Sequence, residues 1–337
     1  MLKQFVFLFM LLTLSFFGFS NQLVSNEGPE RHFGTAQYLA SDEYLSLDEV
    51  RQSDPLDWQS IEIEDASFGF DSRHFWLQIP LLNIQSSTSP WFLRSKYPLL
   101  DTIDVYLLAD EELVQEFHTG DSLPFRQRPI EQPNFVFPLD IKTDKTYSIY
   151  LHVQTTSSLQ LALSLQTESN FWQGIAAESV ATSAFYSILL SMLLYNFVIF
   201  FIVRARSYLF YVLYLASFTL FMASIHGWGY QYLWPNSPKI HELSVVFLIG
   251  PVIIFSALFS STFLRLATIR PALNRLILSF VWIAGIYSVA TLIFPYTVMI
   301  KIGAALAILA AGIAMLSTIQ EWLRSRSREV LLFIIAW

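Results

Sequence analysis

The pattern of apolar and polar residues divides the chain near residue 170. Between about residues 25 and 170, several short stretches alternate apolar and polar side chains with a period of two. Such alternation is typical of a β-strand that buries one face and leaves the other in water. The clearest stretch is residues 147–153, in which the apolar side chains that share a face are Tyr147, Ile149, Leu151 and Val153.

The same pattern predicts further strands before residue 170. They lie at residues 75–79, 91–94, 103–107, 135–139 and 159–165, separated by segments rich in Ser, Thr, Asp, Gly and Pro. Short strands at this spacing, with no long helical pattern between them, favour a two-sheet sandwich. We therefore predict an all-β, jelly-roll-like sandwich over residues 21–172.

After residue 170 the chain contains long apolar runs without charges. Five runs are long enough to cross a hydrocarbon layer of about 30 Å at about 1.5 Å per helical residue. The predicted spans lie near residues 180–203, 207–226, 243–264, 276–294 and 302–320, and a sixth begins at Val330 and is cut off at Trp337. A helix that stopped inside the bilayer would leave its last carbonyls unsatisfied. We therefore expect residues 173–337 to be the transmembrane domain of a longer protein.

Composition and charge agree with this division. Hydrophobic residues make up 54% of the 337 residues and charged residues only 14%, whereas soluble domains carry about 25% charged residues. Residues 1–180 contain 24 Asp and Glu against 10 Lys and Arg, and residues 181–337 contain 3 against 10. The net charge of −7 argues against nucleic-acid binding, and the absence of cysteine excludes disulfides.

The first 20 residues resemble a secretory signal peptide. Lys3 precedes an apolar run over Phe5–Phe17, and Gly18 and Ser20 provide a small-x-small cleavage site. The alternative is a signal anchor that stays in the membrane. The apolar run is shorter than the roughly 20 residues that a span needs, which favours cleavage. Under either alternative, the segment that follows is expected to be exported.

The short loops between spans predict the orientation. The connections after the first, third and fifth spans contain Arg204 and Arg206; Arg265, Arg270 and Arg275; and Arg324, Arg326 and Arg328. In the connections after the second and fourth spans, the Lys and Arg residues are Lys239 and Lys301 alone. Because positively charged loops stay in the cytoplasm, the β-domain is predicted to be periplasmic. The protein is then a multi-pass protein of the bacterial inner membrane.

No catalytic chemistry is visible in the sequence. The spans contain no ionisable side chain in their interiors, which argues against ion pumps, proton-coupled transporters and intramembrane proteases. No Ser-His-Asp order, Gly-rich phosphate loop or HExxH motif occurs. We expect the residues present to have no catalytic role, no cofactor and no metal site.

The β-domain contains residues of the kinds that bind sugars and anions. Aromatic rings stack on sugars, and guanidinium groups bind carboxylates in a bidentate manner. The candidate ligand-binding residues are Trp76, Trp91, Arg94, Asp121, Arg126 and Arg128. For the two Trp residues, packing in the core is the alternative that we favour.

Aromatic residues are concentrated between the second and third spans. Trp228, Tyr230, Tyr232 and Trp234 lie among glycines there. They form either a belt at the membrane interface or a surface on which the β-domain docks. The predicted domain–bundle coupling residues are therefore Asn196, Trp228, Tyr230 and Trp234, with Asn196 in the first span as either a packing residue or a signalling hinge.

Two other groups of residues have two interpretations each. His226, His241 and Glu242 have the side chains of a metal site, but their spacing matches no ligand pattern, so we favour interfacial hydrogen bonding. In the fifth predicted span, small residues recur every four positions at Gly303, Ala307 and Ala311. Such a face permits close helix contact, either within the bundle, which we favour, or in a homodimer.

Several motifs resemble those of one family. The stretches are Leu194-Tyr195-Asn196-Phe197, Arg204–Tyr214, Gly227–Pro235, Thr102–Leu107, Gly120–Pro129 and Tyr147–Val153. They are similar to those of the bacterial seven-transmembrane receptors with diverse intracellular signalling modules (7TMR-DISM), with the type-two extracellular domain. The resemblance covers almost the whole chain after the signal peptide. It implies a periplasmic jelly roll similar to carbohydrate-binding modules, seven spans, and a cytoplasmic output domain.

The predicted function is sensing. The resemblance implies a receptor in which a periplasmic small-molecule ligand, with carbohydrate as one candidate, acts through the bundle on an output domain. That output is commonly a histidine kinase of two-component signalling or a diguanylate cyclase of cyclic-di-GMP signalling, and it lies outside this sequence. The alternative is a membrane scaffold whose β-domain binds a partner without signalling. The expected partners are the ligand and the lipid bilayer, without nucleic acid.

Overall fold

The computed structural model describes residues 33, 35–63, 66–81, 90–142 and 145–325. The predicted signal peptide and the predicted sixth span lie outside these residues. The chain forms two compact units. Among the described residues, the β-unit comprises those from Phe33 to Ile175 together with Ala223–Glu242, and the helical unit comprises Ala176–Met222 together with those from Leu243 to Ser325.

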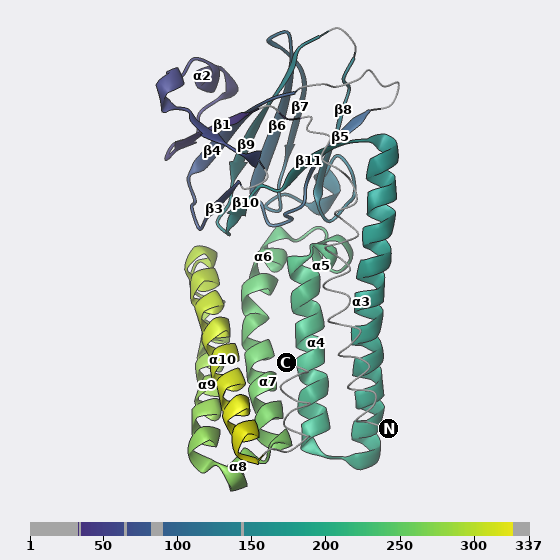
Figure 1. Ribbon diagram of the computed structural model, residues 1–337, viewed down its shortest axis with the longest axis vertical. Coiled ribbons are helices and arrows are strands. Elements are labelled where there is room, and N and C mark those ends of the chain that lie inside the picture. Colours follow the sequence, from purple (N-terminus) through teal and green to yellow (C-terminus); the bar gives the residue numbers. More distant parts are fainter. Residues whose placement is uncertain (1–32, 34, 64–65, 82–89, 143–144, 326–337) are drawn as a thin grey trace. The chain divides into compact units, whose positions relative to one another are not determined.

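The larger layer of the β-unit is a six-stranded antiparallel sheet (Figure 1). Its strand order is β2-β1-β4-β9-β6-β7. The strands span Gln59–Ile61 (β2), Ala36–Ser41 (β1), His74–Pro80 (β4), Tyr147–Gln154 (β9), Thr102–Ala109 (β6) and Glu112–Thr119 (β7). The predicted strands at 75–79, 103–107 and 147–153 are therefore confirmed.

A three-stranded sheet forms the opposite layer, and a two-stranded sheet lies beside it. The three-stranded sheet has the order β11-β5-β8, with β11 at Leu163–Thr167, β5 at Trp91–Ser95 and β8 at Phe135–Leu139. The two-stranded sheet pairs β10, Leu159–Gln160, with β3, Ser67–Gly69. The single strand predicted at 159–165 is wrong. The chain changes sheets between Gln160 and Leu163, and alternation alone cannot reveal such a corner.

The core lies between the sheets. Alternate residues of β4, β6 and β9 point into it, and Trp91, Leu93, Phe135 and Phe137 meet them from the three-stranded sheet. All of these side chains are buried. Two sheets that bury their inner faces against each other make a sandwich, so the predicted fold class is confirmed.

The outer face of the six-stranded sheet is also covered. Residues 42–58, which we call the cover segment, contain α2 at Leu47–Arg51 and a short 3₁₀ helix at Pro55–Asp57. The apolar residues of this segment that pack onto the sheet are Leu45, Leu47, Val50 and Trp58, and they contact Leu39, Trp76, Tyr106, Leu108 and Tyr150. The prediction of one wet face is therefore wrong for the central strands β6 and β9.

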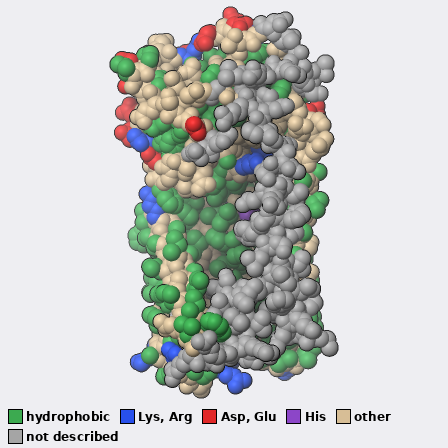
Figure 2. Space-filling view, viewed as in Figure 1, with side chains coloured by type: hydrophobic (Ala, Val, Ile, Leu, Met, Phe, Trp, Pro, Cys, Tyr) green, Lys and Arg blue, Asp and Glu red, His purple; other side chains and the backbone are tan. Residues whose placement is uncertain are grey.

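Within the described part of the chain, five helices are long and apolar enough to cross a membrane. They are α3 at Glu168–Val203, α4 at Arg206–Ile225, α6 and α7 at Pro238–Phe247 and Ile249–Phe263, α9 at Pro271–Ala290, and α10 at Tyr296–Ser325. The short helices α5, Trp228–Tyr232, and α8, Leu266–Ile269, connect them. On the face drawn in Figure 2, hydrophobic side chains cover these helices and Lys and Arg side chains gather at one end.

Two apolar clusters hold the helices together. The first joins α3 to α4 through Leu189, Met192 and Leu215. The second joins α6, α7, α9 and α10 through Val246, Ile249, Ile253, Ala284, Tyr287, Met299 and Leu306. The Tyr211 and Phe259 rings, 4.9 Å apart, link α4 to α7.

Small residues permit the closest helix contacts inside this bundle. A Cβ atom built on Gly303 would lie 2.2 Å from the Tyr287 hydroxyl and 2.8 Å from Ile249. That hydroxyl lies 3.1 Å from the carbonyl oxygens of both Val246 and Met299. Gly303 is buried, Ala307 packs against the second cluster, and Ala311 is exposed. The first two of these small residues therefore serve packing within the bundle, as we favoured.

The contact at Gly303 gives a first prediction. Gly303→Ala should destabilise the helical unit by about 1–3 kcal/mol, because the added methyl group overlaps the Tyr287 hydroxyl. Gly312→Ala is the matched control, since a Cβ there meets nothing within 4 Å. Thermal unfolding in detergent micelles measures both, and Tyr287→Phe should recover part of the loss. Equal unfolding midpoints for the two glycine variants would contradict the packing.

Candidate functional site

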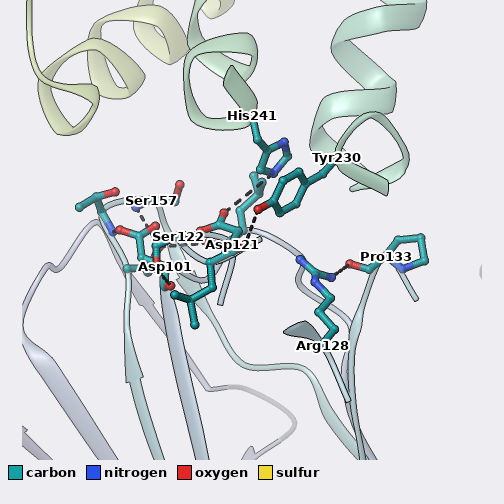
Figure 3. Close-up of polar contacts among 12 residues, drawn as sticks. Asp101, Asp121, Ser122, Arg128, Pro133, Ser157, Tyr230 and His241 are labelled. Carbon is teal, nitrogen blue, oxygen red and sulfur yellow. Dashed lines mark hydrogen bonds and ion pairs between the residues drawn. The ribbon is translucent and has the colours of Figure 1, made fainter. Parts of the chain in front are cut away.

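The segment between the second and third spans belongs to the β-unit. Residues 223–242, which we call the docking segment, contain the end of α4, all of α5 and the start of α6. Their contacts with the β-domain are polar and aromatic (Figure 3). A connection between two spans is thus folded into the aqueous domain, which favours the docking surface over a belt at the membrane interface.

The β-domain presents residues 120–129 to this segment. This run follows β7 and contains a 3₁₀ turn at Phe125–Gln127. Its first residue, Gly120, lies so close to the backbone at Asp101 that a Cβ on Gly120 would be 1.9 Å from the Asp101 carbonyl oxygen. Only glycine fits such an approach. The run is then fixed by backbone hydrogen bonds from Asp121 to Leu100 (2.8 Å) and from Ser122 to Asp101 (3.3 Å).

Tyr230 is the anchor of the docking segment. Its side chain is fully buried, and its hydroxyl donates to the carbonyl oxygen of Leu123. Its ring lies 5.6 Å from the Phe125 ring in an edge-to-face arrangement. The Phe125 amide in turn donates to the carbonyl oxygen of Pro235 at 2.9 Å. Burial raises the pKa of Tyr230 to about 12, so the hydroxyl stays protonated and donates.

Arg128 lies beneath this anchor and is 4% exposed. Its guanidinium carbon is 4.1 Å from the centre of the Phe135 ring, 4.7 Å from Phe125 and 5.8 Å from Tyr230. One nitrogen, Nη1, donates to the carbonyl oxygens of Pro133 and Gln132. Burial lowers the pKa of Arg128 to about 10, and nearby Asp121 opposes the shift. The group is therefore charged at neutral pH and enclosed by aromatic faces.

Asp121 closes the other side of the site. Its side chain is 14% exposed, and one carboxyl oxygen lies 4.0 Å from the His241 Nε2. Burial raises the pKa of Asp121 well above its ordinary value of 3.8, and the Asp101 carboxylate, to which it hydrogen bonds, adds to this shift. Asp101 accepts from the Thr156 amide at 2.8 Å. His241 stacks on Tyr230 with ring centroids 4.4 Å apart (Figure 3).

The remaining aromatic residues of the docking segment have different surroundings. Trp234 packs against Gly229, so that a Cβ there would lie 3.0 Å from the indole ring. Trp228 stacks on Tyr232, which is 66% exposed. Gly227 has φ +76°, and a Cβ on it would lie 3.2 Å from the Pro133 Cβ. Of the aromatic coupling candidates, Tyr230 makes the most direct contacts with the β-domain.

Asn196 bonds within its own helix, and the two histidines His226 and His241 differ in burial. The Asn196 amide donates to the Met192 carbonyl in its own helix at 2.7 Å, and the residue is 5% exposed. His226 is exposed, whereas His241 is buried against Tyr230. Among the described residues, no group of three or more His, Asp or Glu side chains is arranged to hold a metal ion.

The ligand-binding candidates do not form one surface. Trp76 and Trp91 are 0% and 3% exposed and lie in apolar clusters, so core packing describes both rings. Arg94 is 3% exposed and lies on β5, where an Nη2–H donates to the Asn134 amide oxygen at 2.6 Å. Arg126 is exposed. Only Asp121 and Arg128 are brought together, and they meet the docking segment.

A second link is formed by the start of α3. Residues up to Ile175 belong to the β-unit, and α3 continues without a break to Val203. Phe171 is fully buried and stacks on Phe92 of β5 at 4.7 Å. Val136 completes this cluster. The hydropathy pattern does not reveal this link, because Phe171 precedes the first charge-free run, which begins at Val180.

Two protein-family models match the chain. The model described as 7TMR-DISM extracellular 2 matches residues 35–167. The model described as 7TM diverse intracellular signalling matches residues 178–337. No curated protein matches the chain. Asp121 and Arg128 lie in the first match, and the whole docking segment lies in the second.

The shifted pKa of Asp121 gives a second prediction. A carboxyl group whose pKa is raised on folding stabilises the fold fully below pH 3.8, and this contribution is lost as the pH rises through the folded pKa. Asp121→Asn cannot ionise and should therefore become more stable relative to the unmodified protein as the pH increases from 4 to 8. Thermal unfolding of the detergent-solubilised chain measures this difference.

The exposed Asp140 provides the matched control. Asp140→Asn changes a carboxylate that is 64% exposed and pairs with Lys142 at 3.2 Å. Its effect should be small over this pH range, because exposed pairs contribute little. If Asp121→Asn and Asp140→Asn gave the same pH-independent difference, the raised pKa of Asp121 would be contradicted.

Proposed function

The chain belongs to the family of seven-transmembrane receptors with diverse intracellular signalling modules, and we propose that it is the sensing half of a receptor in the bacterial inner membrane. In this proposal the β-domain lies in the periplasm and detects a small molecule. The bundle relays the change to a cytoplasmic output domain. The family establishes a membrane protein with an extracellular domain and a transmembrane part.

One observation carries the proposal. Asp121 and Arg128 of the extracellular domain and Tyr230 and His241 of the transmembrane domain lie in one compact unit. A ligand that favours one arrangement of residues 120–129 therefore acts directly on the docking segment. The docking segment is covalently continuous with α4 and α6, so both spans receive the change.

The first span offers a second route. Phe171 fixes the start of α3 on the three-stranded sheet, and the same helix forms the first span. Three spans are thus tied to the β-domain by packing in addition to chain connectivity. Coupling of this kind requires only that the ligand bind two arrangements with different affinities, and a difference of about 1–3 kcal/mol is typical.

The ligand class and the output domain are further parts of the proposal. We propose a periplasmic small molecule, with carbohydrate as the candidate class. Arg126 is the exposed member of the predicted ligand-binding residues and lies beside Phe125 of the docking site. We propose a histidine kinase or a diguanylate cyclase as the output, following the family resemblance.

Tyr230→Phe tests the relay. Removing the hydroxyl leaves the Leu123 carbonyl without this donor and should cost about 1 kcal/mol of docking, which is about a fivefold change in a two-state balance. The full-length gene product in lipid nanodiscs is assayed for ATP-dependent autophosphorylation and for cyclic-dinucleotide synthesis from GTP. We expect the basal rate of whichever activity is present to change several-fold.

Tyr232→Phe is the matched control for this experiment. Tyr232 lies in the same helix but is 66% exposed, so its hydroxyl contributes no buried contact. Its removal should leave the rate unchanged. A full-length protein without either activity, or one in which Tyr230→Phe behaves as Tyr232→Phe does, would favour the scaffold over the receptor.

A further inference from the structure

A chain of hydrogen bonds crosses the outer face of the six-stranded sheet, away from the docking segment. The His74 Nδ1 lies 3.1 Å from the His152 Nε2, and the His152 Nδ1 lies 2.8 Å from one oxygen of Asp104. The other oxygen of Asp104 lies 2.9 Å from the His118 Nδ1. The strands place these residues in adjacent positions, because Asp104 pairs with both His152 and His118.

Only one of the two facing nitrogens, the His74 Nδ1 and the His152 Nε2, can carry a proton while they remain hydrogen bonded. Because Asp104 accepts from the His152 Nδ1, the neutral His152 ring offers its Nε2 as an acceptor for His74. A single added proton is compensated by the Asp104 carboxylate. A second added proton places N–H groups on both facing nitrogens and two positive charges on rings that stack with centroids 5.3 Å apart. This doubly charged pair cannot keep its geometry.

The surroundings do not relieve that repulsion. His152 is 1% exposed and Asp104 7% exposed, so water reaches the centre of the chain poorly. Tyr44 contacts both rings of the pair, and Asp104 bonds to His152. Tyr106 and Glu116 contact His118 at the other end of the chain of bonds, and the nearby Arg73 is paired with Asp71 at 2.7 Å. Asp104 already accepts from two imidazoles. Burial, with the neighbouring His152, lowers the pKa of His74.

The pair is in contact with the cover segment through Tyr44. The Tyr44 ring lies edge-on to both imidazoles, 5.8 Å from His74 and 5.2 Å from His152. At the far side of the segment, Arg51 donates to the Glu111 carbonyl oxygen at 2.9 Å. Separation of the two rings therefore removes both imidazole contacts of Tyr44, while its side-chain hydrogen bond with Tyr106 and the Arg51 contact remain.

We propose that the His74–His152–Asp104–His118 chain is a pH-responsive latch that holds the Tyr44 end of the cover segment on the sheet. The second protonation of the histidine pair separates the rings and releases residues 42–46. The latch makes the outer sheet face accessible in an acidic periplasm. This inference does not depend on the relay through the docking segment.

The sign of the effect follows from linkage. His74 has a lowered pKa when the segment is closed. Its contribution to the stability of the closed segment is therefore complete above the ordinary histidine pKa of about 6.5 and is lost as the pH falls below it. If the open form binds one more proton than the closed form, the equilibrium constant for opening rises by up to about tenfold for each unit by which the pH decreases. Opening should therefore increase from pH 7.5 to pH 5.

Hydrogen exchange of the whole protein in nanodiscs measures the opening. Exchange rates are corrected for the intrinsic effect of pH, and peptides covering residues 42–58 are compared with peptides covering β8. In the unmodified protein, protection of the cover segment should fall at least several-fold between pH 7.5 and pH 5, while β8 stays unchanged. In His74→Asn, whose amide nitrogen replaces Nδ1 as a donor but does not titrate, protection should not depend on pH.

His152→Asn provides a second variant that keeps the contact with Asp104 and removes the acceptor for His74. It should also abolish the pH dependence. Unchanged protection of residues 42–58 in the unmodified protein would overturn the latch. So would a pH dependence that persists equally in both variants.

Discussion

The burial of the docking segment against residues 120–129 is the interaction on which the rest of the account depends. It places a charged guanidinium, a carboxyl group with a raised pKa and a phenol hydroxyl in one cluster. Buried polar groups of this kind are costly when they lose their partners, because each then bears its desolvation penalty alone. The cluster therefore favours one defined arrangement and opposes partial separation. That property suits a relay, in which a small change at one element must shift another as a whole.

The β-unit and the helical unit are each tightly packed, but by different means. In the β-unit, two apolar layers and the cover segment bury both faces of the central strands, which makes the sheet a stiff platform. In the helical unit, small residues such as Gly303 let the helices approach closely, and the Tyr287 hydroxyl bonds across them. Packed elements of both kinds change between discrete arrangements more readily than they deform continuously. The histidine chain lies on the opposite side of the platform from its apolar core, so it can act on the cover segment without disturbing that core.

In the described part of the chain, sequence periodicity predicted five of the eleven strands and the five helices that could cross a membrane, because these elements depend on local patterns of burial. It failed at 159–165, where the alternation of Leu159, Leu161, Leu163 and Leu165 is continuous although the chain changes sheets. It also failed for the outer sheet face, since the cover segment is largely polar and buries only four apolar side chains there. The docking residue Tyr230 was predicted from local composition, but its partners Leu123, Phe125 and Arg128 lie about a hundred residues away. Nothing in their own sequence indicates the pairing. Trp76 and Trp91 illustrate the converse, because residue type alone does not distinguish a buried ring from one available for stacking.

Cross-linking in native membranes tests the docked arrangement most directly. The chain has no cysteine, so Gly227→Cys combined with Pro133→Cys introduces a unique pair. A Cβ on Gly227 would lie 3.2 Å from that of Pro133, close to the roughly 3.5–4.5 Å of a disulfide. The matched control combines Gly227→Cys with Gly174→Cys, since a Cβ at Gly174 meets nothing within 4 Å. After mild oxidation, the account predicts that the 227–133 pair no longer reacts with a maleimide polymer, while the control pair still does. Full reactivity of both pairs would contradict it.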